Sequence, residues 1–274
     1  MCIYALLAIS FDFLANFVGL VCLGGALFMG VGGYIAGGLN AAFGLSPVLT
    51  IPIATVGGAM ICTLLLLPCL PIRGVYFAIV TLIYPLLLLK IIEATRILGG
   101  TDGLPGLATF PSIWIDQYFA IGITIITVFG LRRLVNEDIG LLFRSIKDND
   151  QAVKASGIGI TRYKALAVFI ASGIGCLAGA YLCHLYAWVG ISFFALDFSI
   201  LPIAAAVLGG MGTFAGPLIG AAILVPLSEI LRALGGLRIV FYALILILII
   251  GIRPEGLFNY FQRKYHQFEH WIEV

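Results

Sequence analysis

The sequence predicts an all-α protein, a polytopic bundle of about 8–10 transmembrane helices. Of its 274 residues, 62% are hydrophobic and only 10% are charged, and the mean hydropathy is +1.14. Soluble domains carry about 25% charged residues, so this composition excludes a sizeable soluble domain. Residues 13–72 hold no charge at all, which is enough chain for two to three membrane crossings. We therefore expect one membrane domain over residues 1–274.

Turn residues and charges divide the apolar sequence into spans. Gly24-Gly25 and Ser46-Pro47 separate the first three spans, and Arg73 follows the third. Turn residues fill positions 99–105 (GGTDGLP), so a loop is expected before the fifth span. The sequence predicts spans near residues 3–20, 23–42, 48–70, 75–92, 114–131, 165–187, 198–210, 215–231 and 238–252.

A glycine-rich break interrupts the charge-free stretch of residues 198–228. Irregular backbone at membrane depth is tolerated only where it is buried in protein or lines a cavity. Two interpretations remain open: a hinge or pathway lining, and close packing of helices on small residues. The residues concerned are Gly209, Gly210, Gly212, Gly216 and Pro217.

Charge gathers in residues 132–164, which we call the charged segment. It holds 11 of the 28 charged residues of the chain, and seven of these 11 are basic. Each Lys, Arg or Asp costs about 2.5–3.5 kcal/mol at the centre of a bilayer, so the charged segment is expected to lie in water. Because basic loops stay on the cytoplasmic side, we expect the charged segment there.

A short helix is predicted within the charged segment, over residues 149–156. Asp148 is expected to cap it, with Gln151 three residues later as in a capping box. Gly157 is placed to end it as a C′ glycine. Two turns are not stable alone, so the helix must pack on something. It is either an ordinary surface helix or a docking element for a soluble partner.

The other polar residues predict no chemistry of their own. The six cysteines are scattered, with no CxxC pair, and no Ser/His/Asp or Cys/His set is present. We therefore expect no catalytic residues and no metal. The absence of a GxxxxGK[ST] motif means that any ATP use requires another subunit. The net charge of +2 gives no reason to invoke nucleic acid.

His184 stands alone as a titratable residue in its predicted span. A membrane histidine is a functional candidate by default. Because Tyr186 and Trp188 follow closely, interfacial hydrogen bonding is the favoured role. No intramembrane Asp/Glu/Lys pair of the sort expected in a proton or sodium relay appears in the sequence, which weighs against a secondary transporter.

Five motifs, in order, resemble the permeases of ATP-binding-cassette (ABC) importers for branched-chain amino acids. They are PIRGVYFAIVTL at 71–82, GGTDGLPGL at 99–107, RSIKDNDQAVKASGIGITRYK at 144–164, VLGGMGTFAGPLIGAAIL at 207–224 and IRPEGL at 252–257. The chain resembles most closely the second of the two permease subunits, and urea permeases share much of the pattern. The family usually has Ser-Leu-Gly followed by Gln or His where this chain has Cys22-Leu23-Gly24-Gly25. It also often carries one more N-terminal helix, so we expect this start to be short of one.

The resemblance implies that the helix at 149–156 is the coupling helix that seats in a cleft of a cytoplasmic ATPase. It implies a heterodimer with a sister permease, two ATPase subunits that bind ATP and Mg, and a periplasmic or surface substrate-binding protein. The chain itself would hold no cofactor and would lie in a bacterial cytoplasmic (inner) membrane. The coupling residues would be Arg144, Asp148, Asp150, Gln151, Ala152, Ala155 and Gly157.

Transport of leucine, isoleucine and valine by alternating access is the function that the resemblance implies. Two alternatives remain open. One is an ABC permease for urea or for other small amides or amino acids. The other is a channel or carrier that acts alone, with the charged segment as a loop that only sets the topology.

Overall fold

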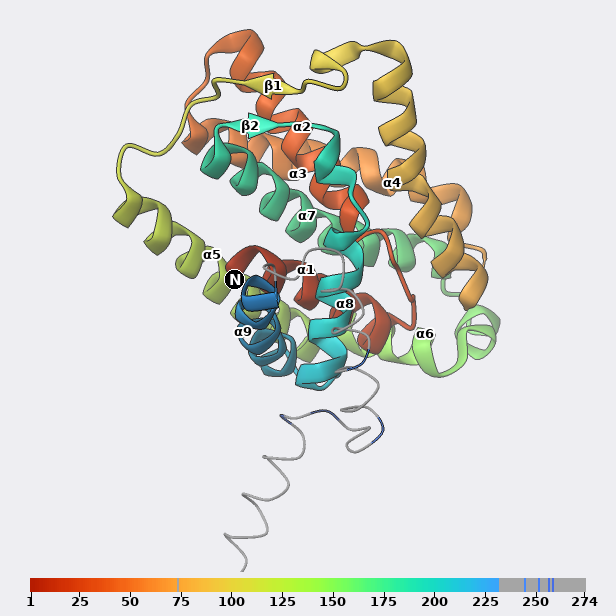
Figure 1. Cartoon of the computed structure of the whole chain (residues 1–274). Coiled ribbons are helices and arrows are strands. Elements are labelled where there is room, and N and C mark those ends of the chain that lie inside the picture. Colours follow the sequence, from red (N-terminus) through yellow and green to blue (C-terminus); the bar gives the residue numbers. More distant parts are fainter. Residues whose placement is uncertain (73, 232–243, 245–250, 252–255, 257, 259–274) are drawn as a thin grey trace, which may run out of the picture.

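The computed structural model describes residues 1–72, 74–231, 244, 251, 256 and 258 (Figure 1). The helices are α1 (Cys2–Asp12), continued by a π-helical turn (Phe13–Val18), then α2 (Gly25–Phe43), α3 (Pro47–Leu66), α4 (Val75–Thr95), α5 (Ile113–Asn136), α6 (Asp138–Ala155), α7 (Ile160–Tyr186), α8 (Asp197–Gly209) and α9 (Ala215–Ile230). Short 3-10 turns (Leu67–Cys69, Ile97–Gly99, Ile191–Phe194) and two short strands, β1 (Leu104–Pro105) and β2 (Trp188–Val189), complete the described part.

The helices confirm the all-α membrane bundle predicted from the sequence. Five are long and apolar enough to cross a membrane, and three shorter apolar helices accompany them within the described residues. These eight helices lie where the first eight spans were predicted. The ninth predicted span, 238–252, lies outside the described residues except at positions 244 and 251.

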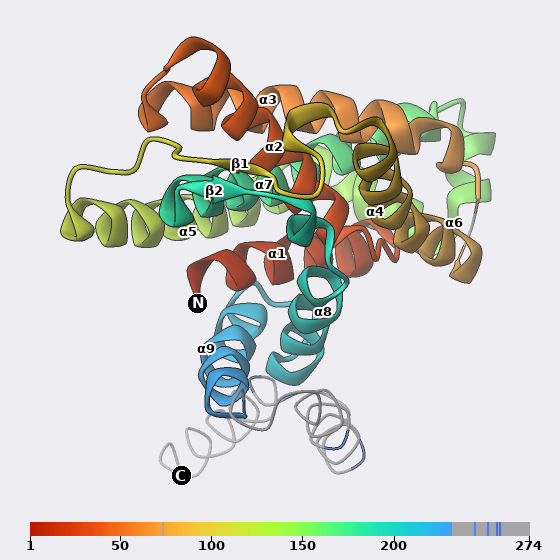
Figure 2. The same cartoon turned by 45° about the horizontal axis from the view of Figure 1, so that its top comes forward.

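Helices α2 and α7 form the centre of the bundle, and α3 packs against both of them with its other face exposed. Glycines allow α2 and α7 to touch along their backbones. A Cβ atom on Gly32 would overlap the backbone of Cys176, and one on Gly179 would overlap the carbonyl of Met29. Figure 2 shows α8 and α9 side by side against α1, to one side of this centre.

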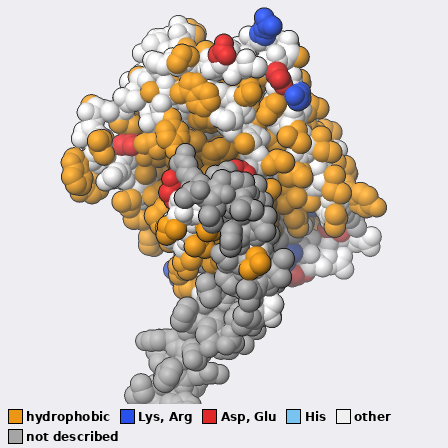
Figure 3. Space-filling view, in the orientation of Figure 1, with side chains coloured by type: hydrophobic (Ala, Val, Ile, Leu, Met, Phe, Trp, Pro, Cys, Tyr) orange, Lys and Arg blue, Asp and Glu red, His pale blue; other side chains and the backbone are white. Residues whose placement is uncertain are grey.

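The outward surfaces of α3, α4 and α5 are apolar, as a lipid-facing surface requires. Hydrophobic side chains cover much of the face seen in Figure 3. On α5 the exposed ones include Ile121, Ile125, Ile126 and Phe129. An exposed apolar surface of this extent fits a bilayer and not water.

The 27-residue helix α7 separates two ends of the molecule, about 40 Å apart at 1.5 Å per residue. At its first end lies α6, and at its second end β2 follows directly (Figure 1). There β1 pairs antiparallel with β2, with Leu104 opposite Val189. This pairing holds the loop of residues 99–112 against the end of the bundle.

Buried hydrogen bonds hold the 99–112 loop in place. The side chain of His184 is fully buried; its Nδ1 donates to the carbonyl of Ala108 (2.7 Å) and its Nε2 accepts from the hydroxyl of Thr50 (2.6 Å). The amide of Ala108 donates to Oδ1 of Asn40 (3.0 Å). The predicted hydrogen bonding of His184 is therefore present, but inside the bundle and not at its surface.

Candidate functional site

The helix α6 carries most of the charged segment and consists of two parts. The backbone leaves helical geometry at Asn149 (φ −156°, ψ 94°), so one helical part precedes this residue and a short one follows it. The Oδ1 atom of Asn149 accepts the N–H groups of Gln151 and Ala152, both at 3.1 Å. The prediction that Asp148 caps the short helix was therefore wrong by one residue. Asp148 still belongs to the preceding part, and only the extended Asn149 can reach the free N–H groups.

The predicted end of the short helix is confirmed at Gly157. Its φ is +81°, a left-handed conformation that glycine adopts without strain, and its N–H donates to the carbonyl of Lys154 (3.1 Å). No atom would lie within 4 Å of a Cβ atom at this position. The glycine is therefore required by the backbone conformation and not by packing, and its side is open to a partner.

The short helix presents small and polar residues to the outside. Val153 turns inward and is buried, and Asp150 is half-buried with its Oδ2 3.7 Å from Nζ of the buried Lys164 on α7. The remaining predicted coupling residues of this part of the chain are exposed. They are Asp148, Gln151, Ala152, Ala155 and Gly157.

The first part of α6 packs on the π-helical turn that follows α1. Phe143 is fully buried and meets Phe13 edge to face, with ring centroids 5.8 Å apart. The guanidinium carbon of Arg144 lies 5.7 Å from the ring centroid of Phe17, within cation–π range. The predicted coupling residue Arg144 therefore contacts the chain's own core.

A cavity of about 320 Å³ lies beside the short helix. Its lining includes Asn149 and Asp150 of the charged segment, Gly19, Gly74, and Lys164 of α7. The short helix thus has open space next to it.

The glycine-rich break is a tight turn between α8 and α9. A Cβ atom on Gly209 would overlap the carbonyl of Gly216, and one on Gly216 would overlap the carbonyl of Gly210. Gly210 and Gly212 have φ values of +107° and +90°, and Pro217 is buried in the first turn of α9. Helix packing and backbone conformation thus both account for the glycines, and the geometry does not test a hinge or pathway role.

The turn lies at the end of the bundle that carries the charged segment. Phe214, at the start of α9, stacks on Phe17 with centroids 5.0 Å apart and planes 7° apart. Phe17 is the same ring that Arg144 covers. In addition, Gly256 of the IRPEGL motif packs directly on the backbone of Gly210, so two of the five motifs meet here.

Sequence reasoning missed Asp12, a fully buried carboxylate at the end of α1. Its Oδ1 accepts the N–H of Gly212 (2.9 Å) and the Nδ2–H of Asn16 (2.6 Å). Its Oδ2 has no hydrogen-bond partner among the described residues. The signal was available, because a single acidic residue inside an apolar helix is a functional candidate by default.

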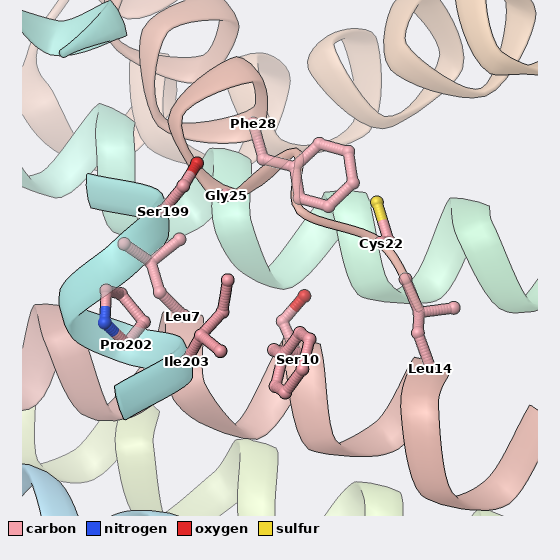
Figure 4. A pocket seen from close by; sticks show the side chains of 10 residues that line it. Leu7, Ser10, Leu14, Cys22, Gly25, Phe28, Ser199, Pro202 and Ile203 are labelled. Atoms are coloured by element: carbon pink, nitrogen blue, oxygen red, sulfur yellow. The ribbon is translucent and has the colours of Figure 1, made fainter. Parts of the chain in front are cut away.

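A second irregular segment, residues 19–24, lies between α1 and α2. The N-terminus of α2 consequently lies inside the bundle, where the hydroxyl of Ser199 accepts the N–H of Ala26 (2.9 Å) and that of Thr81 accepts the N–H of Leu23 (2.9 Å). Cys22 and Gly25, from the stretch that departs from the family pattern, line a small cavity there (Figure 4). Its volume is about 10 Å³, which holds at most one water molecule, so no amino acid fits it in this conformation.

The described residues offer no metal centre. Among them, no three His, Cys, Asp or Glu side chains gather in a way that would hold a metal ion.

Comparison with known proteins connects these features to a family. The family described as "Branched-chain amino acid transport system / permease component" matches residues 1–252. The high-affinity branched-chain amino acid transport system permease proteins LivM of Salmonella typhimurium and of Escherichia coli are each 25% identical to this chain, over 93% of it and 67% of their own length. A probable branched-chain amino acid transport permease protein LivM of Methanocaldococcus jannaschii is also 25% identical, over 89% of this chain and 83% of its own. No solved structure matches the chain. The family match covers nearly all of the chain, and the protein therefore belongs to the family of branched-chain amino acid transport system permease components.

Proposed function

We propose that this chain is the permease subunit of an ABC importer that moves branched-chain amino acids across a bacterial cytoplasmic membrane. The observation that carries the proposal is the short helix of α6, which is capped at Asn149, ended at Gly157 and exposed along its outer face. It lies within a match to a permease family and in a stretch where seven of 11 charges are basic. A basic loop of this kind favours the cytoplasmic side, where an ATPase would meet it.

The proposed assembly contains a sister permease, two ATPase subunits and a substrate-binding protein outside the membrane. The ATPase subunits would bind ATP and Mg, since this chain has no P-loop. Leucine, isoleucine and valine are the proposed substrates, because the relatives are named as permeases for branched-chain amino acids. The binding protein would select the substrate, so the permease needs little affinity of its own.

The proposed mechanism is alternating access driven from the charged segment. Closure of the ATPases would push on residues 149–157, and the cavity of about 320 Å³ beside them leaves room for displacement. The rings of Phe17 and Phe214 would pass this movement to α8 and α9, because Arg144 of α6 covers Phe17. The cavity at the N-terminus of α2, at about 10 Å³, would correspond to a closed path.

A pull-down from native membrane in mild detergent tests this proposal. Co-purification of a P-loop ATPase that Gly157→Arg releases is the expected result, because the arginine would both strain the left-handed backbone and obstruct the docking surface. Gly106→Arg is the matched control. Gly106 is also exposed, has φ +75° and has no atom within 4 Å of a Cβ position, but it lies in the 99–112 loop at the opposite end. This variant should retain the ATPase.

Two outcomes would contradict the proposal. One is a chain that comes down alone yet still moves solute in liposomes, which would establish a carrier that acts alone. The other is normal uptake and normal ATPase binding by the Gly157→Arg variant, which would remove the short helix as the coupling element.

A further inference from the structure

We propose that Asp12 is a positioning residue that links the charged segment to the turn between α8 and α9. The inference rests on the proposed function, since it concerns how movement of α6 reaches the rest of the permease. In this role, the buried carboxylate holds the glycine-rich turn in place, and the position of the turn changes when α6 moves.

The first observation is the long-range hydrogen bond of Asp12. A fully buried carboxylate is costly unless its oxygens are paired, and here Oδ1 accepts the backbone N–H of Gly212, 200 positions further along the chain. A hydrogen bond from a backbone N–H to a charged acceptor is stronger than one between neutral groups. A Cβ atom on Gly212 would meet no other atom within 4 Å, and the φ of this residue is +90°. Close packing therefore does not fix Gly212, and the hydrogen bond to Asp12 connects it to α1.

The second observation is that the residues just after Asp12 are clamped between α6 and the start of α9. They form a π-helical turn, Phe13–Val18, a geometry that is rare and frequent at functional sites. Phe13 contacts Phe143 of α6, and Phe17 contacts both Arg144 of α6 and Phe214. A movement of α6 therefore acts on the helical turn that directly follows Asp12 in the chain.

The third observation is the charge of Lys147. This lysine follows Arg144 by three residues on α6, and its aliphatic stem and backbone lie about 3.1–3.3 Å from a Cβ position on Gly19, just beyond the π-helical turn. Its positive charge favours the ionised Asp12 carboxylate, but less than the hydrogen bonds from Gly212 and Asn16 do. The Oδ2 atom of Asp12 has no hydrogen-bond partner among the described residues. Displacement of α6 would move the Lys147 charge relative to the carboxylate, and would thereby change the strength of the hydrogen bond from Gly212 to Oδ1.

The alternative is a carboxylate that only stabilises the fold, and the two roles differ in what a substitution changes. A structural role lowers assembly, ATP hydrolysis and import together. A positioning role leaves assembly and ATP hydrolysis in place and lowers the amount of solute imported per ATP hydrolysed.

The experiment measures this ratio for the assembled transporter in liposomes, with leucine as the solute. Asp12→Asn keeps the shape and one acceptor for Gly212 but removes the charge. We expect assembly close to that of the wild type, ATP hydrolysis within about twofold, and a ratio about tenfold lower, because a charge-assisted hydrogen bond becomes a weaker neutral one. Lys147→Gln should lower the same ratio by a smaller factor. Thr124→Val is the control, because it also removes a hydrogen bond of a buried side chain, from the Thr124 hydroxyl to the carbonyl of Ala120 (2.8 Å), but Thr124 lies on α5 and does not line the small cavity of Figure 4. It should leave the ratio unchanged.

Three results would overturn the inference. The first is a wild-type ratio in both the Asp12→Asn and Lys147→Gln variants. The second is an equal fall of the ratio in Thr124→Val. The third is a loss of assembly and hydrolysis in parallel with import in Asp12→Asn, while Lys147→Gln matches the wild type. A wild-type chain that binds no ATPase is a different result, because it removes the proposed function itself.

Discussion

The two ends of α7 are held in opposite ways. At its second end, the 99–112 loop is fixed by a strand pair and by buried hydrogen bonds from His184 and Asn40 to Ala108. At its first end, the short helix of residues 150–155 has one buried side chain, Val153, and a cavity of about 320 Å³ beside it. Buried polar bonds resist displacement, whereas exposed segments with few packed side chains open at low cost. The contrast indicates a molecule with one rigid end and one end that a partner can move.

The largest effect is expected where glycines bring backbones into contact. Gly216→Leu should prevent stable folding of the α8–α9 pair, at a cost above about 3 kcal/mol, because its Cβ would overlap the carbonyl of Gly210. A Cβ atom on Gly212 would meet no atom within 4 Å. Gly212→Leu should therefore lower the free energy of unfolding only by the cost of a left-handed backbone, about 1–2 kcal/mol. We expect Gly212→Leu to assemble and yet fail to import, as measured by co-purification and uptake. Loss of assembly in both variants would favour the packing interpretation of this turn.

The rigid end is tested by His184→Ala. The substitution leaves the carbonyl of Ala108 and the hydroxyl of Thr50 without their buried partner, and it opens a cavity. We expect a loss of about 2–4 kcal/mol in stability, seen as a lower thermal midpoint in detergent. Thr50→Val, which removes only the second bond, should cost less. A midpoint unchanged by His184→Ala would contradict the claim that this end is fixed by buried bonds.

The end of α7 that carries the short helix is tested by substitution of the residue that caps this helix. Asn149→Ala should cost about 1 kcal/mol of local helix stability, because two N–H groups lose their acceptor. The expected consequence is up to about fivefold weaker ATPase binding, since the helix must then be ordered on docking. Asp148→Ala is the matched control and should have a smaller effect, as no N–H of the short helix depends on Asp148. The reverse order of the two variants would restore Asp148 as the cap.

The elements that the sequence predicted follow from patterns that act locally. Charge-free runs define the spans, a dense charged stretch defines the segment in water, and a glycine after a helix marks its end. These features need no partner elsewhere in the chain, so the spans up to α9 and the helix end at Gly157 were predicted correctly.

What the sequence did not predict depends on contacts between distant residues. The first part of α6 is held by Phe143 on Phe13, and its charged surface concealed the helix. The cap moved from Asp148 to Asn149 because one residue of extended backbone separates the two parts of α6. The partner of Asp12 is 200 positions away, so the pairing of this carboxylate with Gly212 could not be seen from spacing.

The most direct test of the account is photo-crosslinking from the two ends of the molecule. A photoreactive amino acid would replace Gln151, exposed on the short helix, or Thr101, exposed in the 99–112 loop. After irradiation of native membranes, mass spectrometry would identify the protein attached to each position. The account predicts a P-loop ATPase on Gln151 and none on Thr101. An ATPase attached at Thr101, or none at Gln151 in a transporter that still imports, would contradict it.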